Sequence, residues 1–155
     1  MTMQGAKRLA KNTGNSPGVF IAIFALDRAT KCWALSYLAS YRPKEHALLS
    51  LGLHFNRGIS FSLLENHARL SLTITLVTVG LLGLLCVKSK ALRSTPGMVF
   101  LWAGAIGNLT DRLWYGYVID WIYIFAGYVN LADVWLCVGG GVVLFILFQA
   151  SFRRL

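Results

Sequence analysis

Acidic residues are scarce in this sequence. It contains only 6 aspartates and glutamates against 15 lysines and arginines, and charged residues make up 14% of the chain. An average soluble domain has a charged fraction of ~25%. Hydrophobic residues reach 56%, and the mean hydropathy is +0.59. This composition favours an integral membrane protein of a single domain over a soluble one.

The sequence also lacks the patterns of a zinc site or of a disulfide framework. Its three cysteines, Cys32, Cys86 and Cys137, are odd in number and form no C-x-x-C pair. Its three histidines form no H-x-x-x-H pattern. The basic residues flank apolar stretches instead of alternating with aromatic residues, so the net charge of +9 suits anionic lipid head groups and not nucleic acid.

Four apolar stretches are each about as long as the ~20 residues that cross a bilayer. They run from about 18 to 39, 67 to 87, 97 to 114 and 131 to 152. Ala103, Gly104 and Gly107 give the third stretch a small-residue face, and Gly139-Gly140-Gly141 gives the fourth another, so both allow close helix packing. The sequence predicts a membrane all-α fold with four transmembrane helices in one domain, 18–152, between a basic leader, 1–17, and a tail, 153–155.

The segment from 44 to 61 has a different pattern. Apolar and polar residues alternate from 49 to 55, which is typical of a half-buried strand. The turn signal Asn56-Arg57-Gly58 follows, and the alternation resumes at 59–61. We expect a small extracytoplasmic β-element that lies at the membrane surface.

The basic residues indicate an orientation. Eight of them lie in the leader 1–17, in the loop 88–95 and in the tail 153–155, whereas 115–130 has none. The positive-inside rule then places both termini in the cytoplasm, and 40–66 and 115–130 outside.

Three of the six acidic residues lie between 104 and 133, in an otherwise apolar stretch. A carboxylate at membrane depth costs ~2.5–3.5 kcal/mol even on lenient scales, so Asp111, Asp120 and Asp133 are functional candidates. Two carboxyl groups that share a small desolvated space share a proton as well, and such a pair can activate water and protonate a leaving amine. This chemistry is peptide hydrolysis by an aspartic mechanism.

Each of these residues also has a purely structural interpretation. Asn130 and Asp133 have the spacing of a helix cap and its third residue. Asp111 is compatible with an interfacial ion pair to its neighbour Arg112, and Asp120 with backbone hydrogen bonds in a turn.

The first apolar stretch contains a further pair of charges. Asp27 and Lys31 are four residues apart, so a helix places them on one face at pairing distance. A structural ion pair is the favoured interpretation, because paired charges are tolerated in a bilayer. With the orientation above, this pair and Asp111, Arg112 and Asp133 gather near the outer face.

Five short motifs follow one another in the order of a known family. D-x-x-T-K, N-x-G-x-x-F, G-A-x-G-N-x-x-D-R, V-x-D-F and N-x-A-D have counterparts at 27–31, 56–61, 104–112, 118–121 and 130–133. Over about 18–152 the sequence resembles the lipoprotein signal peptidases, or signal peptidase II. Trp121, Ala103 and Val129 stand where that family usually has Phe, Gly and Phe, so pocket packing and substrate or inhibitor preference are expected to differ.

The resemblance implies an intramembrane aspartic endopeptidase of the bacterial inner membrane. Its substrates would be prolipoproteins, cut just before a cysteine that carries diacylglycerol, and globomycin-type cyclic peptides would inhibit it. By motif position the catalytic pair is Asp120 and Asp133. The substrate or inhibitor cleft would be lined by Asn56, Gly58, Asn108, Arg112 and Asn130, and the supporting residues would be Asp27, Lys31 and Asp111. A monomer with no metal and no organic cofactor is expected, in contact with membrane lipids.

Two other functions remain open at this point. A small proton- or cation-conducting transporter would also need intramembrane acids, although these would be spread through the bilayer depth or repeated between halves. A non-catalytic relative that only binds lipoproteins is a further alternative, against which the intact aspartates argue.

Overall fold

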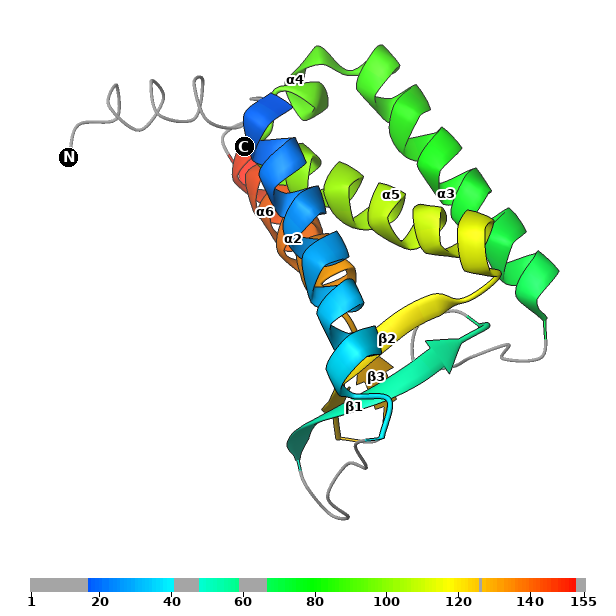
Figure 1. The fold of residues 1–155 in the computed structure, drawn as a ribbon. Helices are drawn as coiled ribbons and strands as arrows, with labels where there is room; N and C mark the ends of the chain where they lie inside the picture. The colour runs from blue at the N-terminus through cyan, green and yellow to red at the C-terminus, as the bar shows by residue number, and fades with distance from the viewer. Residues whose placement is uncertain (1–16, 41–47, 59–66, 126, 153–155) are drawn as a thin grey trace.

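The fold, a computed structural model, describes residues 17–40, 48–58, 67–125 and 127–152. In chain order these ranges contain α2 (Pro17–Tyr37), β1 (Leu49–Asn56), α3 (Ala68–Lys88), α4 (Lys90–Arg93), α5 (Gly97–Tyr115), β2 (Val118–Ile124), β3 (Gly127–Val129) and α6 (Leu131–Phe152). The small sheet lies at one end of the helices (Figure 1). The start of α2, the short α4 and the end of α6 lie at the other end. Residues 1–16 of the predicted leader, the tail 153–155, and residues 44–47 and 59–61 of the predicted β-element are outside the described residues.

The long helices coincide closely with the four predicted apolar stretches, because local signals mark their ends. Pro17 opens α2 and Pro96 precedes α5, which suits a residue that has no N–H to donate. Gly116 ends α5 in the left-handed conformation, with φ 76°, and its N–H bonds the carbonyl of Arg112 at 3.1 Å.

Helices α5 and α6 pack closely through glycines. A Cβ on Gly104 would lie 2.4 Å from a backbone carbonyl of α6, and one on Gly139 would lie 2.7 Å from the carbonyl of Gly97. The predicted small-residue faces are therefore confirmed at Gly104 and Gly139. Gly140 and Gly141 have nothing within 4 Å of such a Cβ, so they play no part in this contact.

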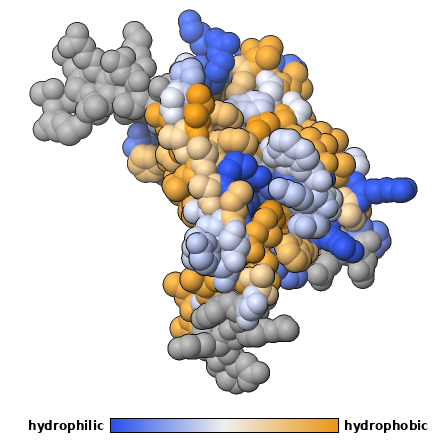
Figure 2. Space-filling view, in the orientation of Figure 1, coloured by the Kyte–Doolittle hydropathy of each residue, from blue (hydrophilic) through white to orange (hydrophobic). Residues whose placement is uncertain are grey.

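Apolar side chains cover the outside of the helices instead of filling a large core. The described core cluster holds only Ile23, Val99 and Ala103, with four partly buried neighbours. Figure 2 shows hydrophobic residues spread over the viewed face of the molecule. Two described helices, α3 and residues 131–149 of α6, are long and apolar enough to cross a membrane, and only 11% of the most apolar part of each is buried. Helix α2 carries three charged residues, and neither α2 nor α5 meets the same criterion of length and apolar composition.

The sheet differs from the predicted β-element. Its strand order is β1-β2-β3, with both pairs antiparallel, and β1 pairs with β2 so that Asn56 lies opposite Val118 and His54 opposite Asp120. The prediction placed the whole element within 44–61, which is wrong in extent: 118–129 supplies two of the three described strands. The cause is physical, since β2 is apolar on both faces apart from Asp120 and so shows no alternation.

Candidate active site

A cavity of about 280 Å³ lies where the sheet meets the helices. Its lining residues are Asn56, Val118 and Asp120 of the sheet, Ile74, Thr75, Thr78 and Val79 of α3, Ala105, Asn108 and Arg112 of α5, and Asp133 and Leu136 of α6. Asp120 and Asp133 therefore open onto the same space from two different elements. The lining combines charged and amide side chains with apolar ones from several elements, among them Ile74, Val118 and Leu136, which suits a peptide with apolar side chains.

Asp120 is almost completely buried, with 1% of its surface exposed. Asn56 Nδ2 donates to its Oδ2 at 2.9 Å, and Asn130 Nδ2 donates to its Oδ1 at 2.5 Å. The turn interpretation is wrong, because Asp120 lies within β2 and accepts from side-chain amides. Burial and the neighbouring charge of Asp133 raise the pKa of Asp120 to about 7, although both amide bonds oppose this rise. A carboxyl group with this pKa can hold or release a proton near neutral pH.

Asp133 is half-buried in the first turn of α6. Its Oδ2 accepts from the backbone N–H of Asn130 at 3.2 Å, and its own N–H donates to Asn130 Oδ1 at 3.2 Å. This reciprocal pair confirms the predicted helix cap. The other oxygen, Oδ1, accepts from Asn108 Nδ2 at 2.8 Å. The cap therefore fixes the second carboxylate beside the cavity, so the structural and catalytic interpretations of Asp133 are compatible.

Each aspartate faces an amide whose orientation is set by other bonds. Asn56 Oδ1 accepts from the N–H of Gly58 at 2.9 Å, so its NH₂ group is left to face Asp120. Asn108 Oδ1 accepts from Lys31 Nζ at 3.1 Å and from Asn130 Nδ2 at 3.2 Å, so its NH₂ group faces Asp133. The donors at both carboxyl groups are thus fixed before any substrate binds.

Behind the two aspartates lies a buried ionic cluster of Asp27, Arg28, Lys31 and Asp111. Lys31 Nζ is 3.2 Å from Asp27 Oδ2, which confirms the predicted pair, and 2.8 Å from Asp111 Oδ2. Arg28 bonds Asp27 at 2.5 Å and also bonds Asp111. Asp111 therefore pairs with two cations of α2 and not with its neighbour Arg112.

The cluster holds together the elements that carry the two aspartates. Asp27 Oδ1 accepts from the N–H of Ala132 at 3.1 Å, at the start of α6. Asp111 Oδ2 accepts from the N–H of Ile119 at 3.3 Å, next to Asp120 in β2. Asp27 and Asp111 thus bond the backbone beside each of the two aspartates, and Asp27, Lys31 and Asp111 do not line the described part of the cavity.

Arg112 lies at the cavity with its guanidinium turned toward the end of β1. Its Nη2 donates to the carbonyl of Gly58 and its Nε donates to Ser71 Oγ, both at 2.8 Å. The sequence patterns assign no role to Ser71 or to Arg28. Arg28 had a usable signal, since it is a third charge in an apolar stretch, whereas Ser71 is an ordinary hydroxyl residue in a helix rich in threonine.

A comparison with models of protein families identifies the family of this chain. The family model described as signal peptidase (SPase) II matches residues 19–149. The chain belongs to the signal peptidase II family. This is a protease family, so the predicted resemblance is confirmed and the transporter interpretation is not favoured.

Individual relatives agree with this assignment. A protein named lipoprotein signal peptidase from Anaplasma marginale is 36% identical over 142 residues, which cover 86% of this chain and 82% of the relative. Another of the same name from Syntrophomonas wolfei is 37% identical, over 88% of this chain and 94% of the relative. A solved structure described as a bacterial membrane enzyme shares the fold, with a TM-score of 0.75 at 21% identity over 88% of this chain and 89% of that one.

Proposed function

We propose that this protein is an intramembrane aspartic endopeptidase that removes signal peptides from diacylglyceryl-modified prolipoproteins, cutting before the lipidated cysteine. One observation carries the proposal: the carboxyl groups of Asp120 and Asp133 line one cavity, and Asn130 bonds to both. Family membership and the names of the relatives support the substrate class.

The two carboxyl groups would divide the chemistry between them. One carboxylate takes a proton from a water molecule, whose oxygen attacks the scissile carbonyl carbon. The other, protonated, carboxyl group donates its proton to the carbonyl oxygen, which gives a tetrahedral intermediate. As the C–N bond breaks, the first carboxyl group passes the proton that it took from water to the leaving amine, and a hydroxyl proton of the intermediate returns to the second carboxylate. A pKa of about 7 makes Asp120 suitable for the protonated role at neutral pH. Asn56, Asn108 and Arg112, which line the cavity, would then face the substrate backbone. Gly58 and Asn130 are not among the described lining residues and would instead hold the amides of Asn56 and Asn108 in place.

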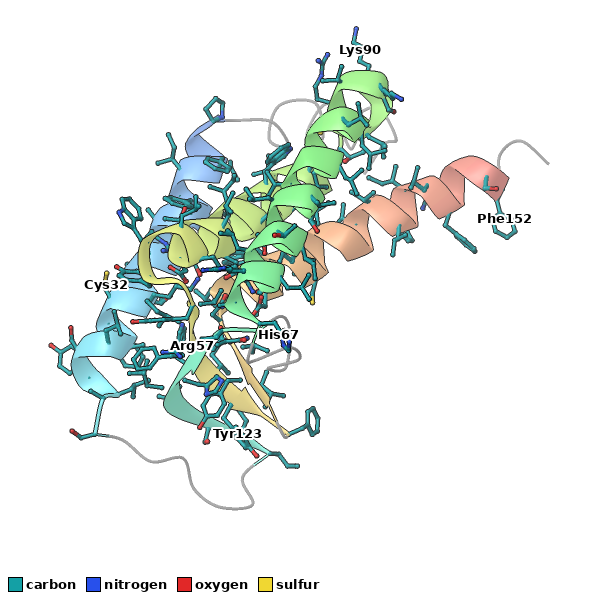
Figure 3. The ribbon with its side chains drawn as sticks, turned by 90° about the vertical axis from the view of Figure 1, so that its right-hand side faces the viewer. Cys32, Arg57, His67, Lys90, Tyr123 and Phe152 are labelled. Atoms are coloured by element: carbon teal, nitrogen blue, oxygen red, sulfur yellow. The ribbon has the colours of Figure 1, made fainter. Side chains whose placement is uncertain are left out.

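The proposed topology has four membrane spans, α2, α3, α5 and α6, in one membrane domain with both termini in the cytoplasm. Ion pairing supports a membrane position for α2, because its charges are buried against α5. Lys90 lies at the far end of α3 from His67, which is beside the sheet (Figure 3). The basic end would face the cytoplasm of a bacterium and the cavity would open near the outer face. There the cavity would admit lipidated substrates or a globomycin-type inhibitor. The protein would act as a monomer.

The test is cleavage of a diacylglyceryl prolipoprotein by purified protein, followed by gel shift with and without globomycin. We expect Asp120→Asn and Asp133→Asn each to abolish cleavage in protein that still inserts and folds. Asp27→Asn is the matched Asp-to-Asn comparison. It should lower thermal stability and leave measurable turnover, because Asp27 would only hold the start of α6 in place and would not take part in the chemistry. Wild-type turnover in either of the first two variants would refute the assignment. Ion flux in liposomes would favour the transporter instead, and a wild-type protein that cuts no lipidated substrate would favour the non-catalytic relative.

A further inference from the structure

Ser71 lies beside the site on α3, one turn after the start of the helix. It is 1% exposed, and its Oγ donates to the carbonyl of Gly58 at 2.5 Å. The same Oγ accepts from Arg112 Nε at 2.8 Å, and Arg112 Nη2 donates to the same carbonyl at 2.8 Å. Ser71, Arg112 and Gly58 therefore form a closed triangle of hydrogen bonds that joins α3, α5 and the residues after β1.

The triangle continues to the catalytic pair through one amide. The N–H of Gly58 donates to Asn56 Oδ1 at 2.9 Å, and Asn56 Nδ2 donates to Asp120 Oδ2 at 2.9 Å. An asparagine amide has an acceptor at one end and donors at the other. Holding Gly58 in place therefore determines that the donor end of Asn56 faces Asp120.

We propose that Ser71 is a positioning residue that acts through Gly58 and Asn56 to hold Asp120 in its reactive geometry. The proposal rests on the proposed function, in which Asp120 is one of the two catalytic aspartates. Ser71 is not among the described residues that line the cavity, so it acts without touching substrate. If its hydroxyl only satisfied the guanidinium of Arg112, its loss would lower stability and leave the chemistry unchanged.

The first test compares Ser71→Ala with wild type in the full chain, using a diacylglyceryl prolipoprotein in lipid bicelles. We expect kcat to fall by roughly 10- to 100-fold with little change in KM, because small misplacements of a reacting group cost rates of this order. The matched control is Thr73→Val, which removes an exposed hydroxyl of the same helix that donates to the carbonyl of Arg69 at 2.9 Å. Ser71→Thr keeps the hydroxyl and should retain most of the rate.

The pH dependence of kcat distinguishes positioning from a merely structural role, because loss of a merely structural residue would leave that dependence unchanged. The bond from Asn56 lowers the pKa of Asp120, so its loss should shift the upper limb of the profile by roughly half to one unit toward higher pH. The other charged or titratable groups that face Asp120 are Asp133 of α6, Lys31 of α2, Arg112 of α5 and His54, which lies opposite it in β1. All four remain in the variant.

A double-mutant cycle decides whether Ser71 acts through Asn56. In an Asn56→Ala background, Ser71→Ala should cost less than threefold, because the amide that it positions is gone. An equal cost in both backgrounds, or a wild-type kcat and pH profile in Ser71→Ala, would overturn the proposal. If Ser71→Ala does not fold, Ser71→Cys keeps nearly the same volume with a weak donor and should give the same loss. Failure of the proposed function looks different: wild type would not cleave, or Asp120→Asn would.

Discussion

Replacing Lys31 by methionine tests the buried ionic cluster most directly. The lysine is 1% exposed, and its Nζ contacts Asp27, Asp111 and Asn108 at 3.2, 2.8 and 3.1 Å. Methionine keeps an unbranched side chain of similar length, so the loss is chiefly one of charge and hydrogen bonds. Two buried carboxylates would then share Arg28 as their only cation within the cluster.

The expected cost follows from this geometry. Removing one partner of a buried ion pair destabilises a protein by ~3–5 kcal/mol. For a chain of this size each kcal/mol lowers the unfolding midpoint by ~2–4 °C, so the midpoint of Lys31→Met should fall by roughly 6–20 °C. The matched control is Lys88→Met at the exposed end of α3, where a change within about 0.5 kcal/mol is expected.

Thermal unfolding in detergent, followed by circular dichroism, measures this difference. Adding Asp111→Asn to Lys31→Met removes one of the two stranded carboxylates and leaves Arg28 to pair with Asp27. The double variant should therefore be more stable than the sum of the two single losses, by ~0.5–3 kcal/mol. A midpoint for Lys31→Met within 2 °C of that for Lys88→Met, or strict additivity in the double variant, would refute the reasoning.

Two further predictions concern helix packing and pH. Gly139→Ala should destabilise by ~1–3 kcal/mol because its Cβ would meet the carbonyl of Gly97 at 2.7 Å, whereas Gly140→Ala, with nothing within 4 Å, should leave the unfolding midpoint unchanged or raise it. Folding raises the pKa of Asp120 from 3.8 to about 7, so its contribution to stability is fully present below pH 3.8 and is lost as pH rises to about 7. The midpoint should decline over that window in wild type and decline less in Asp120→Asn; identical pH dependence in the two proteins would contradict this prediction.

Local signals explain why the helices could be predicted. Pro96, Gly116 and the Asn130–Asp133 cap lie at helix ends, and each acts through its own backbone or a near neighbour. The motif residues at the site were also predictable, because carboxyl and amide groups stand out in an apolar chain. The sequence shows that they are unusual, and the fold brings them together at one cavity.

The rest depended on contacts between distant parts of the chain. Leu49 pairs with Ile124, and the sequence of neither strand identifies the other as its partner. Ser71 cannot be told from Thr73 or Thr75 in the sequence, since all three are hydroxyl residues of one apolar helix. Only the position of Gly58 against that helix separates them, because it receives the hydroxyl of Ser71.

The charges around the cavity favour a single shared proton on Asp120 and Asp133, the proposed catalytic pair. Four aspartates, Asp27, Asp111, Asp120 and Asp133, face three cations, Arg28, Lys31 and Arg112. A buried group of this kind is most stable when it is neutral, since an uncompensated charge is costly away from water. Neutrality requires one protonated carboxyl group, and a pKa raised to about 7 suits Asp120 to hold that proton. Lys31 lowers that pKa, so Lys31→Met should move the upper limb of the activity profile to higher pH. An unmoved limb in an active Lys31→Met variant would mean that the ionic cluster and the proposed catalytic pair titrate independently.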